Sequence, residues 1–395
     1  MPTAVIDKEL DKIPAEITVS QHYDNALMLI RLRGMPVGQV LLPASNGRID
    51  CHLGIRNLLI ENPQWDFWDN WLKNYLNYEE MPEMAEPPKA TVAVCTRNRP
   101  KDLKVCLDGL LSLPDDGQEI LVVDNCPSNN DTKNLVGSYP EVRYVREDKK
   151  GLNNARNRAL LEAKNEIVAF IDDDATPDKN WLRSMVRDFD TPLVMGVTGL
   201  TLPLELETEA QEIFERLTPF SRGFMRVVYD SAKIDPVDCG RLGSGVNMAF
   251  RKKVLECVGR FDESLETGSP GRSAGDIDFF SRILAKGYRI VYDPSALNWH
   301  RHRGEWEDLR RQLYDYGVGI FAYYTKSLLF EHSISTTQVA RRWVHSQLQQ
   351  LVRSILRQPP KIPLDLLLIR LFGCAVGPWA YLYSVCRQRS NNKLR

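Results

Sequence analysis

The chain has 395 residues, of which 43% are hydrophobic and 26% are charged, and its formal net charge at pH 7 is -1. This length and composition fit a soluble globular protein with one large domain or two to three ordinary domains and a sizeable buried core. The near-neutral charge argues against a nucleic-acid partner for the protein as a whole.

The cysteines and the N-terminal residues indicate in which cellular compartment the protein resides. The eight cysteines are scattered without a C-x-x-C pair, a pattern that indicates reduced, buried thiols. The first sixteen residues, MPTAVIDKELDKIPAE, lack the basic and apolar regions of a signal peptide. We therefore expect a cytoplasmic protein.

Residues 1–86 form a small N-terminal module in this interpretation. The stretch at residues 25–44 contains two β-rich runs around a turn and predicts a hairpin, and the aromatic stretch at residues 65–76 predicts a helix. Residues 79–90 are acidic and rich in proline without periodicity, so we interpret them as a linker. The expected boundary lies near residue 87.

Residues 87–330 alternate apolar β-like runs with helical patterns, which predicts an α/β domain. The first runs, ATVAVCT, EILVVDN, VRYVRED and EIVAFID, are separated by helical segments. Strands connected in this way form a mostly parallel sheet flanked by helices. The pattern becomes mixed between residues 194 and 302, and residues 307–330 predict a helix that packs on the domain.

Polar residues end several of these predicted strands. Thr96, Asp124 and the triplet Asp172, Asp173 and Asp174 all fall at the carboxyl edge of the sheet, where α/β proteins bind ligands. Three adjacent carboxylates need positive charge, and hard cations such as Mg²⁺ and Mn²⁺ bind carboxylate oxygens together with substrate phosphates. The triplet therefore predicts a metal-bridged diphosphate site, although a solvated loop or helix cap fits it equally well.

Several ordered blocks favour the first interpretation. The first set is CTRNRPKDLKVCLDGLL, EILVVDNCPSNNDT, VRYVREDKKGLNNARNRALLEA and EIVAFIDDDATPDKNWL. The second is VTGLTLPLELET, GRLGSGVNMAFRKKVL, GRFDESL, AGDIDFFSRILAKGYRIVYDPSALNWHRHR and LRRQLYDYGVGIFAYYTK. Together they resemble the inverting family 2 glycosyltransferases of bacterial type, over about residues 88–330. The resemblance implies a GT-A fold, a Rossmann-like mixed sheet flanked by helices.

The resemblance also implies residue roles. It assigns contacts with the nucleotide sugar to Thr96, Arg97, Arg99, Asp124, Arg156, Asp172, Asp173 and Asn247. Asp124 would contact the uracil or ribose, although a carboxylate at a strand end can also cap a loop. Asp173 lies between the two aspartates of the D-x-D pattern, and its side chain is expected to point away from theirs.

The metal would be Mn²⁺ or Mg²⁺, bound by Asp174 and His302. His300 and His302 project to the same side if their segment is extended, so that either imidazole could complete the metal shell. The resemblance favours His302. Both histidines could instead be ordinary, partly buried side chains.

Inverting transfer also needs a base that takes the proton of the acceptor hydroxyl. Asp276 matches the aspartate of the family's Glu-Asp pair and is the expected catalytic base. The family usually has Glu immediately before this aspartate, whereas this chain has Gly275, which puts acceptor binding in doubt. Asp278 is expected to contact the acceptor or to be an acid on the helix surface.

Residues 331–395 form a basic, helical C-terminal region in this interpretation. From residue 341 onward there are ten Lys and Arg residues and a single acid, Asp365. The apolar stretch 362–386 is interrupted by Asp365, Arg370 and Pro378, so it falls short of a regular membrane span. It could lie in a membrane interface or pack on the enzyme as a helical hairpin, and the sequence does not decide between them.

The resulting hypothesis is a metal-dependent inverting glycosyltransferase in the cytoplasm, either free or at the inner face of the plasma membrane. Its donor would be a nucleotide-diphosphate sugar, with UDP favoured and dTDP or GDP as alternatives, and its acceptor a saccharide or a lipid-linked molecule. Gly275 supports one alternative, a catalytically impaired protein that binds nucleotide sugar. A nucleotidyltransferase fits less well, because CTRNRPKDL lacks the glycines of its phosphate loop.

Overall fold

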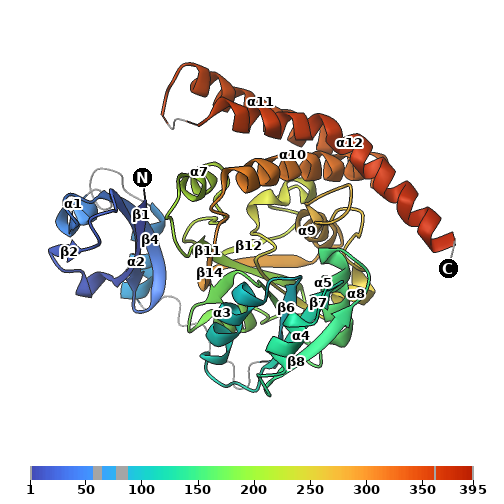
Figure 1. The fold of residues 1–395 in the computed structure, drawn as a ribbon, viewed down its shortest axis with the longest axis horizontal. Coiled ribbons are helices and arrows are strands. Elements are labelled where there is room, and N and C mark those ends of the chain that lie inside the picture. The colour runs from blue at the N-terminus through green and yellow to red at the C-terminus, as the bar shows by residue number, and fades with distance from the viewer. Residues whose placement is uncertain (1, 57–64, 77–87, 360–361, 394–395) are drawn as a thin grey trace.

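A nine-stranded mixed sheet lies at the centre of the molecule (Figure 1). The computed structural model describes residues 2–56, 65–76, 88–359 and 362–393. The strand order is β10-β14-β11-β13-β9-β6-β7-β8, and β12 pairs with β14. The strands are β6 (Ala90–Thr96), β7 (Glu119–Asn125), β8 (Val142–Glu147), β9 (Ile167–Asp172), β10 (Ala175–Pro177), β11 (Val194–Pro203), β12 (Val227–Tyr229), β13 (Asn247–Arg251) and β14 (Arg289–His300).

The predicted α/β architecture is confirmed. Strands β9, β6, β7 and β8 are parallel, whereas β13 runs antiparallel to both of its neighbours, β9 and β11. The sheet is therefore mixed. Strands β6 and β7 are apolar along their length because helices cover both faces and leave nearly every side chain buried.

The helices divide between the two faces of this sheet. Helices α3 (Pro100–Leu111), α4 (Asp131–Val136) and α6 (Trp181–Arg187) pack into one apolar core. Helices α5 (Leu152–Glu162), α8 (Val254–Cys257) and α9 (Gly275–Ala285) pack into the core on the other face. Helix α7 (Glu209–Leu217) and the short 3-10 helix η3 (Pro236–Arg241) belong to the connections after β11 and β12.

The N-terminal residues form a second, smaller sheet of β1 (Thr3–Glu9), β3 (Asn25–Leu32) and β4 (Met35–Pro43). Strands β3 and β4 are an antiparallel hairpin, and the turn between them has positive φ at Arg33 and Gly34. The remaining elements of this part are the 3-10 helix η1 (Leu10–Lys12), β2 (Glu16–Thr18), β5 (Arg48–Asp50), α1 (Cys51–Arg56) and α2 (Trp65–Tyr75). Most of the predicted linker, including the boundary at residue 87, lies outside the described residues.

The small sheet is attached to the large one by polar and apolar contacts. The Arg31 guanidinium lies 2.7 Å from Asp178, which follows β10, and 2.7 Å from Asp7. The backbone N–H of Thr3 donates to the carbonyl of Leu206 at 2.8 Å. Leu29 packs into an apolar cluster with side chains of β11 and β14. The N-terminal residues therefore contact the segment that follows the aspartate triplet.

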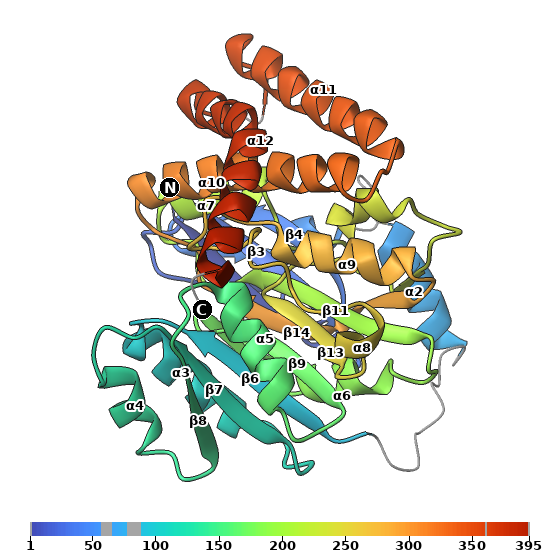
Figure 2. The ribbon, with the colours of Figure 1, turned by 90° about the vertical axis from the view of Figure 1, so that its right-hand side faces the viewer.

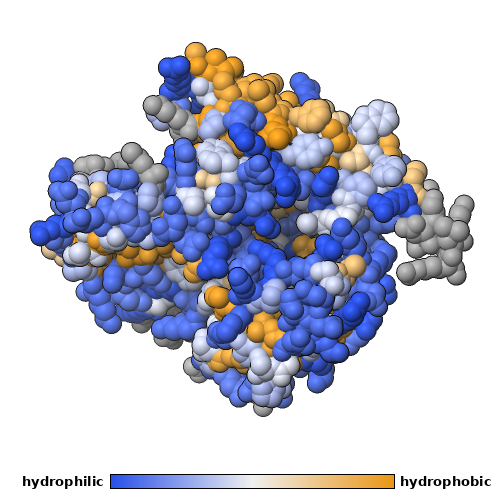
Figure 3. Space-filling view, viewed as in Figure 1, coloured by the Kyte–Doolittle hydropathy of each residue, from blue (hydrophilic) through white to orange (hydrophobic). Residues whose placement is uncertain are grey.

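Three long helices stack beside the sheet: α10 (Trp306–Leu329), α11 (Ser335–Ile355) and α12 (Leu364–Lys393) (Figure 2). Helices α10 and α12 approach closely at glycines. A Cβ atom at Gly317 would lie 2.1 Å from the carbonyl oxygen of Arg370, and one at Gly373 would lie 2.4 Å from that of Tyr314. The outer surface of α11 and α12 carries many apolar side chains (Figure 3).

We expect Arg31→Ala to lower the free energy of unfolding by about 3 kcal/mol, because it leaves the largely buried carboxylate of Asp178 without its counter-ion. The matched control is Arg48→Ala, whose exposed pair with Glu16 should contribute less than about 0.5 kcal/mol. Urea unfolding followed by circular dichroism measures both. Equal losses would show that the Arg31 contact does not hold the two sheets together.

Candidate active site

The aspartate triplet lies where β9 ends, next to the end of β14. Strands β10 and β14 are antiparallel and pair Ala175 with His300, and the N–H of Arg301 donates to the carbonyl of Asp174 at 2.9 Å. This register brings Asp172, Asp174 and His300 together, with one ligand atom of each within 4.8 Å of the others. Two carboxylates and an imidazole are a suitable donor set for Mn²⁺ and an acceptable one for Mg²⁺.

Arg99 supplies most of the positive charge next to the triplet. Its guanidinium lies 2.5 Å from Asp173 and 2.8 Å from Asp174. The hydroxyl of Thr96 donates to Asp173 at 2.7 Å, so the side chain of Asp173 is buried and turned toward β6 and α3. Thr96 and Arg99 therefore hold the triplet in place.

The pKa values show that the triplet is short of positive charge. Burial and the charge of Asp174 raise the pKa of Asp172 to about 6 and that of Asp173 to about 7. For Asp174 itself burial is outweighed by His300 and Arg99, so that its pKa is lowered. A bound divalent cation would favour the ionised form of all three groups.

The two histidines of the HRH segment have different surroundings. The Nε2 atom of His300 lies 3.1 Å from Asp174, whereas Nε2 of His302 lies 2.8 Å from Glu215. Burial opposes the charge of His300, but Asp174 outweighs it and the pKa of His300 is raised. Burial lowers the pKa of His302 despite Glu215. The structure thus places His300 in the acidic cluster and His302 behind it, in contrast to the sequence interpretation.

Asp124 and Arg97 lie on neighbouring strand ends. Asp124 is fully buried, and one carboxylate oxygen accepts a hydrogen bond from Tyr144 at 3.0 Å. The other oxygen has no hydrogen-bond partner among the described residues, and burial raises the pKa of the group. Arg97 is exposed and donates to the carbonyl of Cys126 at 3.3 Å. An unpaired buried acceptor of this kind suits a ligand that donates a hydrogen bond.

Asp276 lies at the start of α9 and is linked to the triplet through Arg156. One oxygen of Asp276 accepts from the N–H of Gly245 at 2.7 Å, and the carbonyl of Gly245 accepts from Arg156 at 3.1 Å. Arg156 is buried, and its charge opposes the rise in the pKa of Asp172. Gly245 has no room for a side chain, because a Cβ would lie 2.6 Å from the guanidinium of Arg156. The small-residue loop before β13 therefore lets both charged groups approach the backbone of Gly245.

The structure also explains why a glycine occupies position 275. A Cβ at this position would lie 2.2 Å from the side-chain nitrogen of Asn153 and 2.8 Å from the carbonyl oxygen of Leu265. The Asn153 amide itself donates to the carbonyl of Asp262 at 2.7 Å. Asn153 thus fills the space beside Asp276, which leaves no room for the glutamate that the family usually carries.

Two expected ligand contacts do not fit the structure. Asp278 is fully buried and forms ion pairs with Arg282 and Lys326, so its carboxylate joins α9 to α10 and is not open to an acceptor. The amide of Asn247 donates to two backbone carbonyls at 2.8 Å and accepts from Trp181 at 2.7 Å. Every polar atom of the Asn247 side chain is therefore used within the core.

Sequence reasoning missed two residues next to the site. Glu215 on α7 contacts His302, and Arg222 follows Phe220, whose ring packs edge-on against His300 at 5.2 Å. Burial lowers the pKa of Arg222, although the charge of Asp276 opposes this, and its guanidinium donates to the carbonyls of Pro219 and Ser221 at 2.6 Å and 3.1 Å. Neither residue lies in a recognisable motif, and only the folded connection after β11 brings them to the site.

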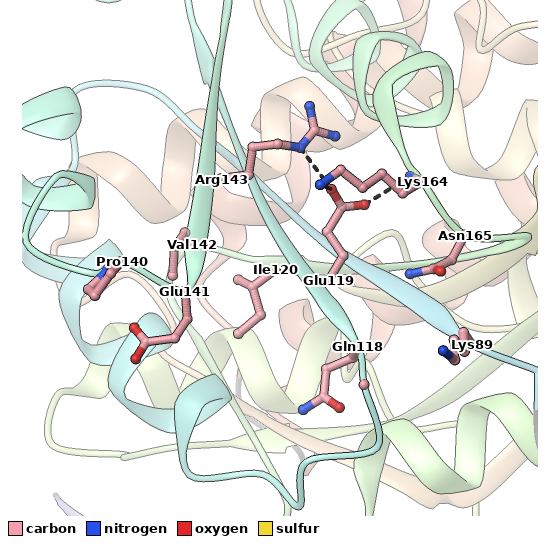
Figure 4. Close-up of a pocket in the computed structure, with 11 residues that line it drawn as sticks. Lys89, Gln118, Glu119, Ile120, Pro140, Glu141, Val142, Arg143, Lys164 and Asn165 are labelled. Carbon is pink, nitrogen blue, oxygen red and sulfur yellow. Dashed lines mark hydrogen bonds and ion pairs between the residues drawn. The ribbon is translucent and has the colours of Figure 1, made fainter.

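An open cavity lies elsewhere, at the amino-terminal ends of β6, β7 and β8 (Figure 4). Its lining includes Lys89, Arg143 and Lys164. Glu119 accepts a hydrogen bond from the Arg143 guanidinium at 2.7 Å, and the Lys164 ammonium lies 3.9 Å from it, so one acid offsets part of this charge. The cavity is thus at the opposite edge of the sheet from the aspartates.

Comparison with known families decides the classification. The family model for glycosyl transferase family 2 matches residues 91–259, which include β6 to β9, the triplet and β13. The chain carries a family 2 glycosyltransferase domain. Asp276, His300 and the long C-terminal helices lie beyond the matched residues.

Curated relatives agree with this family. The chain is 27% identical over 222 residues to a pre-mycofactocin glycosyltransferase of Mycobacterium tuberculosis, which covers 55% of this chain and 44% of that protein. It is 26% identical over 235 residues to the glycosyltransferase AglE of Haloferax volcanii, with 57% and 71% covered. The chain thus spans less than half the length of the mycobacterial relative.

Solved structures give a weaker likeness. A mannosyltransferase of Pyrobaculum calidifontis, solved with GDP-mannose and Mn²⁺, has 18% identity and a TM-score of 0.46 over 82% of each chain. GalNAc-T7, solved with UDP, GalNAc and Mn²⁺, has 14% identity and a TM-score of 0.43, with 66% of this chain and 55% of that chain covered.

Proposed function

We propose that this protein is a metal-dependent inverting glycosyltransferase that uses a nucleotide-diphosphate sugar. The observation that carries the proposal is a cluster of possible metal ligands together with one further carboxylate at the start of α9. Asp172, Asp174 and His300 form the cluster, and Asp276 is connected to it through Gly245 and Arg156, whose charge acts on Asp172. A cation site beside a carboxylate base is what inverting sugar transfer requires.

Asp276 is the base in this proposal. The acceptor hydroxyl oxygen forms the new bond to the anomeric carbon, the bond from that carbon to the diphosphate oxygen breaks on the opposite face, and the hydroxyl proton passes to Asp276. The backbone N–H groups of Gly245 and Ile277 fix the two carboxylate oxygens at 2.7 Å and 2.9 Å. These contacts hold the carboxylate in one orientation toward the incoming hydroxyl.

Mn²⁺ or Mg²⁺ would be held by Asp172, Asp174 and His300. When bound, the cation supplies positive charge to the departing nucleoside diphosphate. The raised pKa values of Asp172 and Asp173, about 6 and about 7, support such a cation, because the positive charges of Arg156, Arg99 and His300 do not outweigh burial and the charge of Asp174 at these two carboxyls. His300 replaces His302 as the proposed nitrogen ligand, because only His300 reaches Asp174.

Asp124 favours a nucleotide base that donates a hydrogen bond. Its unpaired oxygen can accept the ring N–H of uracil, thymine or guanine, which keeps UDP as the first candidate and dTDP or GDP as alternatives. Arg97 is exposed beside this position and is a candidate for contact with the nucleotide. The acceptor in this proposal is a saccharide or a lipid-linked molecule.

The alternative is a nucleotide-sugar-binding protein that has lost catalysis. Gly275 supports it, because Asn153 occupies the place of the usual glutamate and the acceptor loses that contact. Asp276 and the acidic cluster are nevertheless both present. Turnover of the donor decides between the two functions.

We expect Asp276→Asn to abolish sugar transfer and donor hydrolysis while nucleotide affinity stays within about twofold, because the amide is close in shape to the carboxylate but cannot take a proton and accepts from only one of the two backbone N–H groups. Transfer is measured with UDP-sugars on wild type and variant, and affinity by calorimetry. Normal turnover in this variant would refute the assignment of the base.

The neighbouring acid is the matched control. Asp278→Asn removes the buried partner of Lys326 and Arg282, so it should lower the free energy of unfolding by about 3 kcal/mol. Asp276→Asn loses one backbone hydrogen bond and should lower it by only about 1 kcal/mol. If both variants were equally destabilised, Asp276 would be a structural acid as well.

We further propose that the protein works at the cytoplasmic face of a membrane. One helix among the described residues, Leu364–Gln388, is long and apolar enough to cross a membrane, which by itself is weak support. Its close packing on α10 through glycines argues for a helix that lies on the membrane surface. Exposed apolar side chains repeat along its outer side: Leu364, Leu368, Phe372, Trp379 and Tyr383.

Helix α11 continues this apolar surface. Leu348, Val352 and Ile355 are exposed at helical spacing, and Figure 3 shows an apolar area over α11 and α12. Arg341, Arg353 and the other basic residues of this region supply positive charge without a matching number of acids. An apolar stripe with basic neighbours suits a bilayer that contains anionic lipids.

We expect the protein to float with vesicles of phosphatidylcholine and phosphatidylglycerol, but to bind pure phosphatidylcholine at least about tenfold less, because the basic residues need anionic lipid. The double variant Phe372→Ser, Trp379→Ser should stay in solution with unchanged donor hydrolysis. Flotation of the variant like wild type, or a salt-independent dimer without vesicle binding, would contradict this location.

A further inference from the structure

A buried row of polar contacts runs from helix α7 to the aspartate triplet. Oε2 of Glu215 lies 2.8 Å from Nε2 of His302. Nδ1 of His302 lies 3.1 Å from Nδ1 of His300, and Nε2 of His300 lies 3.1 Å from Asp174. Four side chains from α7, the end of β14 and the end of β9 are thus joined through both nitrogens of each imidazole.

The positions of the imidazole protons along this row follow from the groups at its two ends. A neutral imidazole has one N–H and one unprotonated nitrogen. Glu215 can only accept while it is ionised, so the nitrogen of His302 that faces it must be the N–H. Nδ1 of His302 is then an acceptor, and Nδ1 of His300 must be the donor between the two rings. When a cation is bound, this arrangement leaves Nε2 of His300 free to offer it a lone pair beside Asp172 and Asp174. Without a cation this nitrogen lies 3.1 Å from the Asp174 carboxylate and carries a proton as well.

Apolar side chains surround His302. Its side chain is 1% exposed, and the rings of Phe214 and Phe220 lie 4.6 Å and 5.8 Å from its centre. Water therefore has little access to replace Glu215 as the acceptor. The opposite placement of the proton would set an unprotonated nitrogen against a carboxylate oxygen in an apolar surrounding, which is unfavourable.

Helix α7 is also fixed to the backbone of the HRH segment. Thr208 and Gln211 form a capping box at the start of the helix. The Gln211 amide donates to the carbonyl of His302 at 3.0 Å, and the Thr208 hydroxyl donates to that of Gly304 at 3.0 Å. Glu215 lies one turn beyond Gln211, so the contacts that cap α7 also set the distance between Glu215 and His302.

We propose that Glu215 and His302 are positioning residues which fix the proton on Nδ1 of His300 and so present its Nε2 to the metal. The inference rests on the proposed function, because it concerns the ligand shell of the proposed metal site. It gives His302 a role one step behind the metal and assigns a role to Glu215, which no motif of the sequence marks. Partners of this kind orient metal ligands in many proteins.

Binding of Mn²⁺ to the full-length protein without nucleotide tests the proposal by calorimetry. We expect Glu215→Ala to weaken Mn²⁺ binding by about 10- to 100-fold, because His302 can then turn its proton toward His300. Glu215→Gln should stay within about threefold of wild type, because its amide oxygen can accept the same hydrogen bond. Glu209→Ala, exposed on the same helix, is the matched control and should bind like wild type.

The outcomes separate this inference from the function on which it rests. If wild type binds no Mn²⁺, the proposed metal site itself is refuted. If wild type binds and Glu215→Ala binds equally well, the metal site stands and the positioning role is overturned. Should Glu215→Ala fail to fold, ¹⁵N spectra of histidine-labelled wild type still decide: His302 with its proton on Nε2 supports the proposal, and a proton on Nδ1 overturns it.

Discussion

The repulsion among three adjacent carboxylates at the end of β9 is the constraint on which the site depends. Burial and mutual charge raise the pKa values of Asp172 and Asp173, and Arg156, Arg99 and His300 offset only part of this cost. The remaining shortage of positive charge is tolerable in a protein that binds a divalent cation together with a diphosphate. The segments around the triplet hold these charged groups in place.

Segments from both ends of the chain hold the charged groups in place. Arg31 of β3 pairs with Asp178, four residues after Asp174, and therefore fixes the segment that leads away from the triplet. On the other side, Lys326 of α10 pairs with Asp278 and fixes the helix that begins at Asp276. The N-terminal sheet and the C-terminal helices thus stabilise the metal side and the base side of the proposed active site respectively.

Sequence reasoning predicted the strands well, because β6, β7 and β9 are buried on both faces and read as continuous apolar runs. It favoured His302 over His300 as the metal ligand. An extended segment turns both histidines to one side, and only the pairing of Ala175 with His300 brings His300 next to Asp174. Asp276 and Asp278 differ by about 200° around a helix, so one faces the site and the other the interior. Which of the two aspartates faces the site depends on where α10 packs, and no local sequence pattern indicates this long-range contact.

Calorimetric titration of UDP, dTDP and GDP, with and without Mn²⁺, tests the central claim most directly. The account predicts that wild type binds one of these nucleotides much more tightly with Mn²⁺, and that Asp174→Ala loses this gain of at least about tenfold because it removes a metal ligand. Binding that ignores both the metal and the substitution, or no binding of any of the three, would contradict it and would leave the acidic cluster as a charged loop in a family 2 fold.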